Sequence, residues 1–287
     1  MKALIFGAAG QVGRALAFAA PAEAEVTALG RLECDITDRE AVREAVAAVR
    51  PDLVFNAAAY TAVDRAEAEP ERAALLNADA AGWITEAARA EGARTLYVST
   101  DFVFDGLAGR PYLADDEPHP LSVYGRTKLD GERAVLAADP KALVVRTAWV
   151  YSAHGANFVR TMLRLLGERD RLTIVADQIG TPTAAASLGR ALWALVKADA
   201  FHIHHFTDAG VASWYDFAIA VQEEALAAGL ADRTAEIVPI RTQDYPTPAR
   251  RPAFSVLDKT ATWAAIGVPA HWRVPLRACI QEIKERG

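Results

Sequence analysis

Three regularly spaced glycines near the N-terminus limit what this chain can fold into. Gly7, Gly10 and Gly13 directly follow the apolar residues 2–6 and open a stretch, 12–20, with helical spacing. Glycine lets a strand turn sharply into a helix and lets a diphosphate approach the backbone, while the helix N-terminus attracts negative charge. The spacing is GxxGxxG rather than the general GxGxxG. Its position in a strand–turn–helix unit nevertheless predicts a dinucleotide site.

The first half alternates short apolar runs with alanine-rich helical stretches. The predicted strands are residues 2–6, 26–29, 52–58, 95–99 and 143–150, and the predicted helices are 12–20, 39–49, 71–91 and 122–138. The strands lack polar alternation, which is typical of a parallel sheet covered on both faces. This half predicts an α/β fold with a Rossmann-like, doubly wound parallel sheet.

The second half has a different pattern. Its predicted strands are residues 172–176, 202–206 and 236–240, and its predicted helices are 157–166, 187–196, 214–228 and 274–284. The proline-rich residues 245–252 cannot form a regular helix or a central strand. We expect an NAD(P)-binding domain over residues 1–150. A smaller C-terminal α/β substrate lobe over 151–287 should be partly interleaved with it and pack over the carboxyl edge of the sheet.

Charge and composition exclude several classes of function. The chain has 37 acidic and 31 basic residues, a net charge of −6, which argues against a nucleic-acid partner held by bulk attraction. The apolar runs are far shorter than the ~18 residues of a membrane span, and no signal-peptide pattern precedes the first strand. Cys34 and Cys279 allow at most one bridge and are typical of reduced thiols. We therefore expect a cytoplasmic protein without a membrane partner.

The residues after the second strand bear on cofactor choice. Arg31 stands where many NAD sites have an acidic residue, and its guanidinium suits a 2′-phosphate, which favours NADPH with NADH still possible. The alternative for Arg31 is a solvated surface side chain. Asp35 either contacts adenine or caps a turn.

A hydroxyl, a tyrosine and a lysine form a candidate catalytic set. Thr100 ends the fourth strand, and the four-residue spacing of Tyr124 and Lys128 puts both on one helix face. Lowering a tyrosine pKa from ~10 to about 7 takes about 4 kcal/mol, which Lys128 and the nicotinamide charge are expected to supply in large part. Thr100 would orient the substrate oxygen. The alternative is an ordinary pair on an exposed helix.

These residues together resemble the dTDP-4-dehydrorhamnose reductase family of the extended short-chain dehydrogenase/reductase superfamily. Stretches similar to family motifs lie at 56–67, 99–106, 120–128, 146–151, 157–158, 177–183 and 246–252, and the resemblance runs from residue 1 to the final helix. The family uses NADPH or NADH to reduce the C4 keto group of dTDP-4-dehydro-L-rhamnose. This is the last step of dTDP-L-rhamnose biosynthesis, so a dTDP-sugar substrate is implied.

The resemblance implies a role for each matching position. The catalytic set would be Thr100, Tyr124 and Lys128. The cofactor-binding set would be Gly7, Gly10, Gln11, Val12, Gly13, Arg31, Asp35, Ile36, Ala57, Ala58, Ala59 and Thr61, together with Tyr124 and Lys128. The sugar-nucleotide wall would be formed by Val103, Phe104 and Trp149, with Asn157 and the Gln178 loop nearby as further substrate contacts.

Physical reading of the residues adds to this set. Trp149 offers an apolar stacking face at the end of the fifth strand, with core packing as the alternative. Arg250 and Arg251, bounded by prolines, could meet the substrate diphosphate, with a solvated loop as the alternative.

Two departures from the family pattern affect the expectations. Phe102 replaces the tyrosine that the family usually has, so the hydroxyl of that tyrosine is absent. Arg14 and Ala15 stand where metal-dependent dimeric members carry a glutamate. We therefore expect a monomer with no magnesium-bridged dimer and no metal site. His202 and His204 share a strand face, but zinc would need further ligands, so a structural role is expected for both.

Three other functions fit the same residues. One is a sugar-nucleotide epimerase or dehydratase, which would retain NAD and consume no stoichiometric NADPH. Another is a reductase of a different dTDP-4-keto-6-deoxysugar. The third is a non-catalytic NADP-binding regulatory subunit, because the regulatory subunit of methionine adenosyltransferase resembles this same branch.

Overall fold

Six parallel strands form the central sheet of the computed structural model, which describes residues 1–286. The strand order is β10-β5-β4-β3-β1-β2. The bounds are β1 Lys2–Phe6, β2 Glu25–Leu29, β3 Leu53–Asn56, β4 Arg94–Thr100, β5 Leu143–Thr147 and β10 His202–His205. The chain leaves β1 toward β2 on one side and returns to β3 on the other. The switch point of this doubly wound sheet therefore lies between β1 and β3, where such sheets bind ligands.

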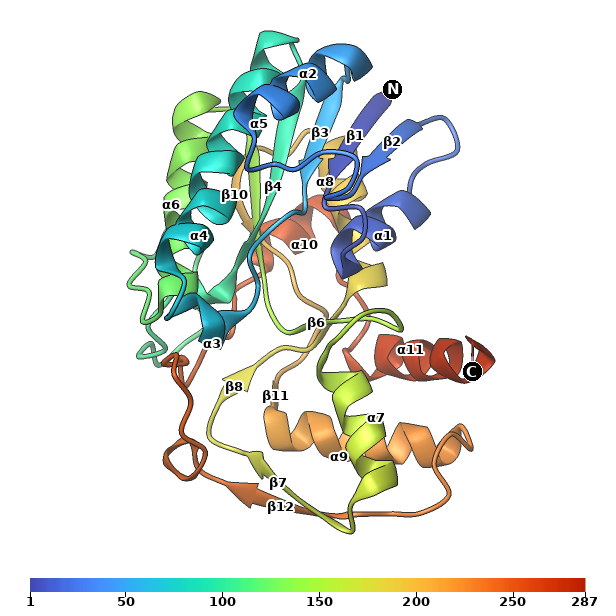
Figure 1. The fold of residues 1–287 in the computed structure, drawn as a ribbon. Coiled ribbons are helices and arrows are strands. Elements are labelled where there is room, and N and C mark those ends of the chain that lie inside the picture. The colour runs from blue at the N-terminus through green and yellow to red at the C-terminus, as the bar shows by residue number, and fades with distance from the viewer. Residues whose placement is uncertain (287) are drawn as a thin grey trace.

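Helices cover both faces of the sheet, as the sequence pattern predicts (Figure 1). One face carries α1 (Gln11–Phe18), α8 (Ala185–Lys197) and α10 (Thr260–Ile266). The other carries α2 (Arg39–Val49), α5 (Ala80–Ala90) and α6 (Val123–Ala138). The strands contribute apolar side chains to separate clusters on the two faces. Helices cover both faces of the inner strands β1, β3, β4 and β5, which explains their apolar runs, while the edge strands β2 and β10 stay partly exposed.

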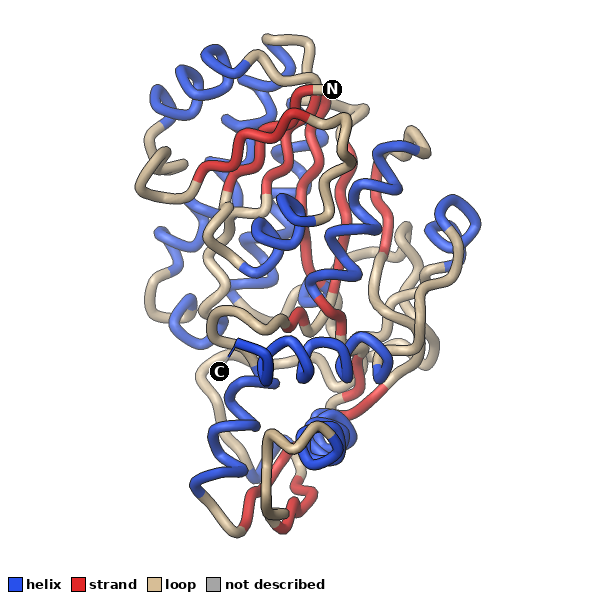
Figure 2. The backbone as a smooth tube through the Cα atoms, turned by 90° about the vertical axis from the view of Figure 1, so that its right-hand side faces the viewer, coloured by secondary structure: helices blue, strands red, loops and turns tan. Residues whose placement is uncertain are grey.

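A smaller part of the molecule, built from segments beyond residue 150, lies below the carboxyl edge of the sheet (Figures 1 and 2). Its helices are α7 (Phe158–Glu168), α9 (Trp214–Ala227) and α11 (Arg273–Arg286). Its short strand pairs are β7 (Arg171–Val175) with β12 (Glu236–Ile240), β8 (Ile179–Gly180) with β11 (Ala212–Ser213), and β6 (Val150–Tyr151) with β9 (Thr183–Ala184). An aromatic cluster around Phe217, Tyr151 and Trp272 forms its core.

The chain crosses between the two parts more than once. After β6 and α7 it returns to the large sheet through α8 and β10, and β10 pairs with β5 in parallel. Residues beyond 150 therefore build both the sheet edge and the smaller part. Among residues 1–286, none of the helices is both long and apolar enough to span a bilayer.

Local side chains set several element boundaries. Asp38 caps α2, Ser122 caps α6 and Asn157 caps α7, each accepting backbone amide protons of the first turn. The predicted strand 143–150 ends early because Trp149 adopts φ +48°, which separates β5 from β6. The predicted strand 52–58 likewise ends at Asn56.

The predicted helix 71–91 is interrupted by a π-helical turn. It begins as α4 (Pro70–Ala74), widens at η1 (Leu75–Asp79) and continues as α5. Asn77 in this turn accepts from the Tyr60 amide at 2.8 Å and donates to Thr127 of α6 at 3.0 Å. The short helix α3 (Val63–Ala66) precedes α4, and the 3-10 turns η2 (Asp101–Val103) and η3 (Thr242–Asp244) follow β4 and β12.

Candidate active site

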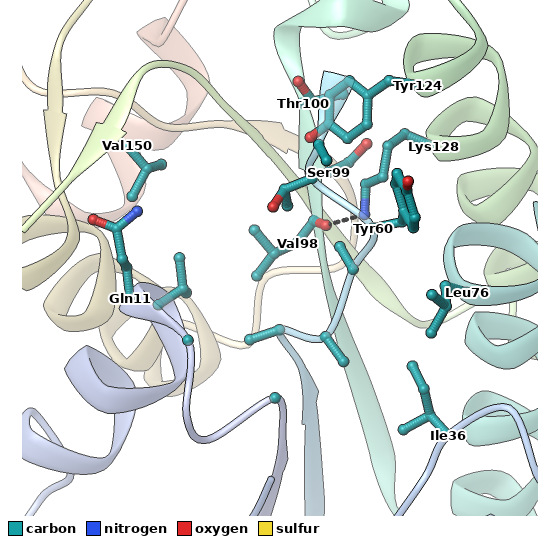
Figure 3. A pocket seen from close by; sticks show the side chains of 18 of the residues that line it. Gln11, Ile36, Tyr60, Leu76, Val98, Ser99, Thr100, Tyr124, Lys128 and Val150 are labelled. Carbon is teal, nitrogen blue, oxygen red and sulfur yellow. Dashed lines mark hydrogen bonds between the residues drawn. The ribbon is translucent and has the colours of Figure 1, made fainter. Parts of the chain in front are cut away.

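A cavity of about 960 Å³ opens where β1, β3, β4 and β5 end (Figure 3). Its walls come from the glycine turn, the strand ends, the start of α6 and the segment that leads into α7. The predicted site residues that line it are Gly7, Gly10, Gln11, Val12, Arg31, Asp35, Ile36, Ala57, Ala58, Ala59, Thr61, Thr100, Tyr124, Lys128, Trp149 and Asn157.

The glycine turn fits a dinucleotide diphosphate. A Cβ on Gly7, which has φ +83°, would lie 2.6 Å from the amide nitrogen of Ala58, and one on Gly13 would lie 2.2 Å from the Gly7 oxygen. Gly10 caps α1 and offers no side chain to its first amides. The first amide groups of the helix therefore face the cavity without a capping side chain, as an anion site requires.

Arg31 and Asp35 stand at the rim beyond the glycine turn. Asp35 Oδ1 accepts from the Thr37 amide at 3.0 Å and the Thr37 hydroxyl at 2.8 Å, and these bonds hold the pKa of Asp35 below its usual range. Asp35 therefore does cap a turn, one of the two alternatives left open. The Arg31 guanidinium lies 3.5 Å from Asp35 with 74% of its side chain exposed, so a phosphate can reach it.

Thr100, Tyr124 and Lys128 converge on one wall of the cavity (Figure 3). Thr100 ends β4, while Tyr124 and Lys128 lie one turn apart at the start of α6. Lys128 Nζ donates to the Val98 oxygen at 2.7 Å and lies 3.9 Å from the centre of the Tyr97 ring. These contacts hold the ammonium group at the end of β4.

Burial governs the protonation of the two titratable members of this set. It raises the pKa of Tyr124 to about 12, although the Thr100 hydroxyl opposes the change. Burial also lowers the pKa of Lys128 to about 7, with the Glu132 charge acting in the opposite direction. In the protein without cofactor, Lys128 does not draw the pKa of Tyr124 toward 7, and the joint effect expected from Lys128 and the nicotinamide charge stays a prediction. Tyr124 is a neutral phenol at pH 7, the form that can donate a proton.

A buried ion pair supports this wall from behind. Glu132 on α6 and Arg146 on β5 are each 2% exposed in their side chains and lie 2.7 Å apart. Glu132 also accepts from the Ser99 hydroxyl at 2.5 Å. The pair ties α6 to β4 and β5 at the residues next to the candidate catalytic set.

Trp149 lines the cavity from a strained backbone. Its φ is +48°, its ring stacks on Trp214 with centroids 3.6 Å apart, and a Cβ on Gly180 would lie 2.6 Å from it. Nearby, Gln11 Oε1 accepts from Asn157 Nδ2 and from Ser152 Oγ, each at 2.9 Å. The glycine turn and the smaller part are thus joined at the cavity by side-chain hydrogen bonds.

Some of the expected site residues do not line this cavity. Val103 and Phe104 are completely buried, and Phe104 stacks on Tyr112 at 4.1 Å between ring centroids. Their side chains therefore cannot form the cavity wall. Gly13 lies beneath the turn and supports it rather than facing the cavity.

The remaining expected substrate contacts lie in loops outside the cavity. Gln178 Nε2 donates to the Thr242 hydroxyl at 3.1 Å. Arg251 pairs with Asp64 at 2.8 Å, so its guanidinium is already occupied, and Arg250 is exposed. The proline-rich segment is therefore held to the large part by Arg251, a contact that sequence spacing cannot reveal.

The sequence reasoning missed several residues of the cavity wall. Arg65 and Arg72 line it and supply positive charge, while Tyr60 accepts from Arg65 at 2.8 Å. Asp101 lines it too, next to Thr100. Asp101 and Arg65 fall inside the stretches matched to family motifs, which was the one signal available for them. Within residues 1–286, no group of three or more His, Cys, Asp or Glu side chains could hold a metal ion.

Comparison with known proteins gives consistent matches along nearly the whole chain. The family model described as RmlD substrate binding domain matches residues 1–285. A dTDP-4-dehydrorhamnose reductase of Aggregatibacter actinomycetemcomitans is 41% identical over 96% of this chain and 97% of its own length.

Two solved structures agree with that match. The dTDP-4-dehydrorhamnose reductase ortholog of Clostridium acetobutylicum has a TM-score of 0.93 and 37% identity, covering 99% of this chain and 100% of its own. The enzyme of Bacillus anthracis, solved in complex with NADP, has a TM-score of 0.92 and 32% identity, covering 98% and 99%.

Proposed function

This chain belongs to the RmlD substrate-binding-domain family, its relatives include dTDP-4-dehydrorhamnose reductases, and on that basis we propose the reaction that it catalyses. The reaction is the NADPH-dependent reduction of the C4 keto group of dTDP-4-dehydro-L-rhamnose to dTDP-L-rhamnose. It completes the synthesis of this activated sugar.

One observation carries the proposal. One cavity brings together, at the end of β4, the Thr100 hydroxyl, the Tyr124 phenol and the Lys128 amine. The same cavity contains the glycine turn and the N-terminus of α1, which no side chain caps. A phosphate-binding turn and a proton donor within one cavity are the two requirements of reduction by a nicotinamide cofactor. The complex of the Bacillus anthracis relative with NADP supports the cofactor assignment.

The side chains of this protein donate the proton to the substrate and orient the substrate and the cofactor. Bound NADPH supplies the hydride that reaches C4. Tyr124 is a neutral phenol at pH 7, as an ordinary tyrosine is, and burial raises its pKa further to about 12; it donates its proton to the carbonyl oxygen. Lys128 holds the nicotinamide ribose and, when protonated, stabilises the phenolate that Tyr124 becomes. Thr100 donates a hydrogen bond to the same carbonyl oxygen.

Local positive charge must hold two polyanionic ligands on a chain of net charge −6. The cavity supplies it through the α1 N-terminus and through Arg31, which is 74% exposed although it lies 3.5 Å from Asp35. Arg65 and Arg72 also line the cavity, but they share the carboxylate of Glu69 at 3.3 and 3.4 Å. Trp149 offers a ring face for an apolar part of the sugar nucleotide. Arg31, exposed at the rim, supports a preference for the 2′-phosphate of NADPH over NADH.

The test follows NADPH absorbance after the 4-keto sugar nucleotide and its 3,5-epimerase are added to the full chain. We expect stoichiometric oxidation, and a loss of at least about 10²-fold in Tyr124→Phe because the proton donor is removed. NADPH oxidation by Tyr124→Phe at the wild-type rate would refute the assigned role. Tightly retained NAD without net oxidation would point to an epimerase or dehydratase instead.

We also propose a monomeric, cytoplasmic enzyme. Arg14 stands just after the glycine turn, where it donates to the Ala9 oxygen at 3.1 Å and presents a cation rather than a metal ligand. The thiols of Cys34 and Cys279 are buried and unpaired, as a reducing compartment allows. Sedimentation with and without Mg²⁺ tests the oligomeric state, and a Mg²⁺-dependent dimer would contradict it.

A further inference from the structure

Asp101 lies beside the hydroxyl that the proposed reaction needs and competes for its only proton. Thr100 Oγ1 donates to Asp101 Oδ1 at 3.1 Å and accepts from the Phe102 amide at 3.2 Å. A threonine hydroxyl has one proton to donate and two lone pairs. While the Thr100 hydroxyl donates its hydrogen bond to Asp101, it cannot donate one to a substrate carbonyl.

The surroundings of Asp101 disfavour its ionised form. The residue is 2% exposed and borders the cavity, and its Oδ2 has no hydrogen-bond partner in the described part of the chain. A bare, buried carboxylate oxygen is costly, and a carboxylic acid carries less of that cost. Burial raises the pKa of Asp101 to about 7, with the hydroxyls of Ser255 and Thr100 acting in the opposite direction.

The groups that face Asp101 come from four places in the fold. They are the Thr100 hydroxyl at the end of β4, the Phe102 amide in η2, the Ser255 hydroxyl after the proline-rich segment, and Tyr124 on α6. Tyr124 is the titratable member of this group, and the negative charge of Asp101 helps to raise its pKa. All four are uncharged at neutral pH, so they do not hold Asp101 as a carboxylate by charge.

We propose that Asp101 is a positioning residue that sets the direction of the Thr100 hydroxyl. As a neutral acid, Asp101 donates a hydrogen bond to Thr100 Oγ1. Thr100 Oγ1 then accepts two hydrogen bonds, from Asp101 and from the Phe102 amide. Its own proton is free to donate to the C4 carbonyl oxygen. As a carboxylate, Asp101 accepts the hydrogen bond of the Thr100 hydroxyl, which then cannot donate to the carbonyl oxygen of the substrate. The proton on Asp101 stays there through turnover, because the proton that ends on the sugar comes from Tyr124. This inference rests on the proposed reduction and adds a pH-dependent control to it.

A double-mutant cycle with a pH readout tests the proposal. We would measure kcat at about pH 6 and about pH 8, one unit either side of the titration of Asp101, for wild type, Asp101→Asn, Thr100→Val and the double variant. The Asn amide donates at every pH. The pH 6 to pH 8 ratio of kcat in Asp101→Asn should therefore be at least about fivefold smaller than that of the wild type.

Lys128 also titrates near pH 7, and the cycle separates the two groups. A fall in rate caused by Lys128 persists in all four proteins, whereas one caused by Asp101 acts only through the Thr100 hydroxyl. In the Thr100→Val background, Asp101→Asn should leave the pH ratio unchanged. Asp105→Asn is the matched control, because Asp105 in the same segment is held ionised by the Leu107 amide and the Tyr112 hydroxyl. It should keep the wild-type ratio.

Two results would overturn the proposal: an unchanged pH ratio in Asp101→Asn, or the same change with and without the Thr100 hydroxyl. If Asp101→Asn fails to fold by circular dichroism, Thr100→Val decides alone. Its pH ratio should be smaller than that of the wild type, and an equal ratio overturns the proposal. Absence of any turnover by the wild type would instead refute the proposed function.

Discussion

Replacing Glu132 by Gln tests whether a buried ion pair supports the catalytic wall. Glu132 and Arg146 are each 2% exposed in their side chains, and two Arg146 nitrogens donate to the Glu132 oxygens at 2.9 and 2.7 Å. The Ser99 hydroxyl also donates to Glu132, at 2.5 Å. Glutamine keeps the shape of glutamate but removes its charge, which leaves the Arg146 guanidinium buried without a counter-ion.

The expected magnitude follows from that burial. Breaking a buried pair by removing one partner costs about 3–5 kcal/mol, because the surviving charge stays desolvated. Arg146→Met should cost a similar amount, since it leaves the Glu132 carboxylate unpaired. The double variant removes both charges and should lose at least about 2 kcal/mol less than the sum of the two single losses.

Equilibrium urea unfolding, followed by far-UV circular dichroism, measures these free energies. Glu168→Gln is the matched control, because Glu168 pairs with Arg164 at 2.7 Å with both side chains more than half exposed. An exposed pair of this kind contributes little, so the control should stay within about 0.5 kcal/mol of wild type. A similarly small loss in Glu132→Gln, or strictly additive single effects, would refute the reasoning.

Three further predictions follow from close contacts and burial. Gly180→Ala places a Cβ 2.6 Å from the Trp149 ring, which must move, so we expect KM for the sugar nucleotide to rise about tenfold, measured by steady-state kinetics. Gly109→Ala, which meets nothing within 4 Å, should leave KM unchanged. Gly13→Ala places a Cβ 2.2 Å from the first carbonyl of the glycine turn, so we expect NADPH binding measured by fluorescence titration to weaken at least about tenfold; unchanged affinity would contradict the close-approach argument. Burial lowers the pKa of His205 to about 3, so the stability that its neutral form contributes is present above about pH 6.5 and is lost as the pH falls toward 3. His205→Gln should therefore flatten the decline of unfolding free energy over that window, and an unchanged slope would contradict the assignment.

The sequence alone determined the features that depend on near neighbours in the chain. Gly10 and Gly13 fix the turn through backbone sterics within a few residues, because a Cβ on either would approach the Gly7 oxygen. Gly7 is different, since its Cβ would meet Ala57 and Ala58 at the end of β3, a contact that only the fold creates. Tyr124 and Lys128 share a cavity wall because a helix brings residues four apart onto one face. The inner strands were predictable from local sequence as well, because a strand buried on both faces has a continuous run of apolar residues.

The tertiary structure decided which side chains reach the cavity. Phe104 and Arg65 both belong to matched motifs, yet Phe104 is buried against Tyr112 while Arg65 lines the cavity. Arg251 is engaged by Asp64, a partner 187 positions away in the chain. Contacts of this kind depend on where whole elements pack, which local spacing does not specify.

Protonation in the site was also a tertiary outcome. The spacing of Tyr124 and Lys128 suggested mutual charge stabilisation, but desolvation dominates, raising the pKa of the phenol and lowering that of the amine. Asp101 titrates near neutrality because the surrounding chain removes it from water. The sequence thus determined which chemical groups are present and which of them share an element. Only packing decided which groups meet and which protonation state each one holds, because desolvation and contact are properties of the folded whole.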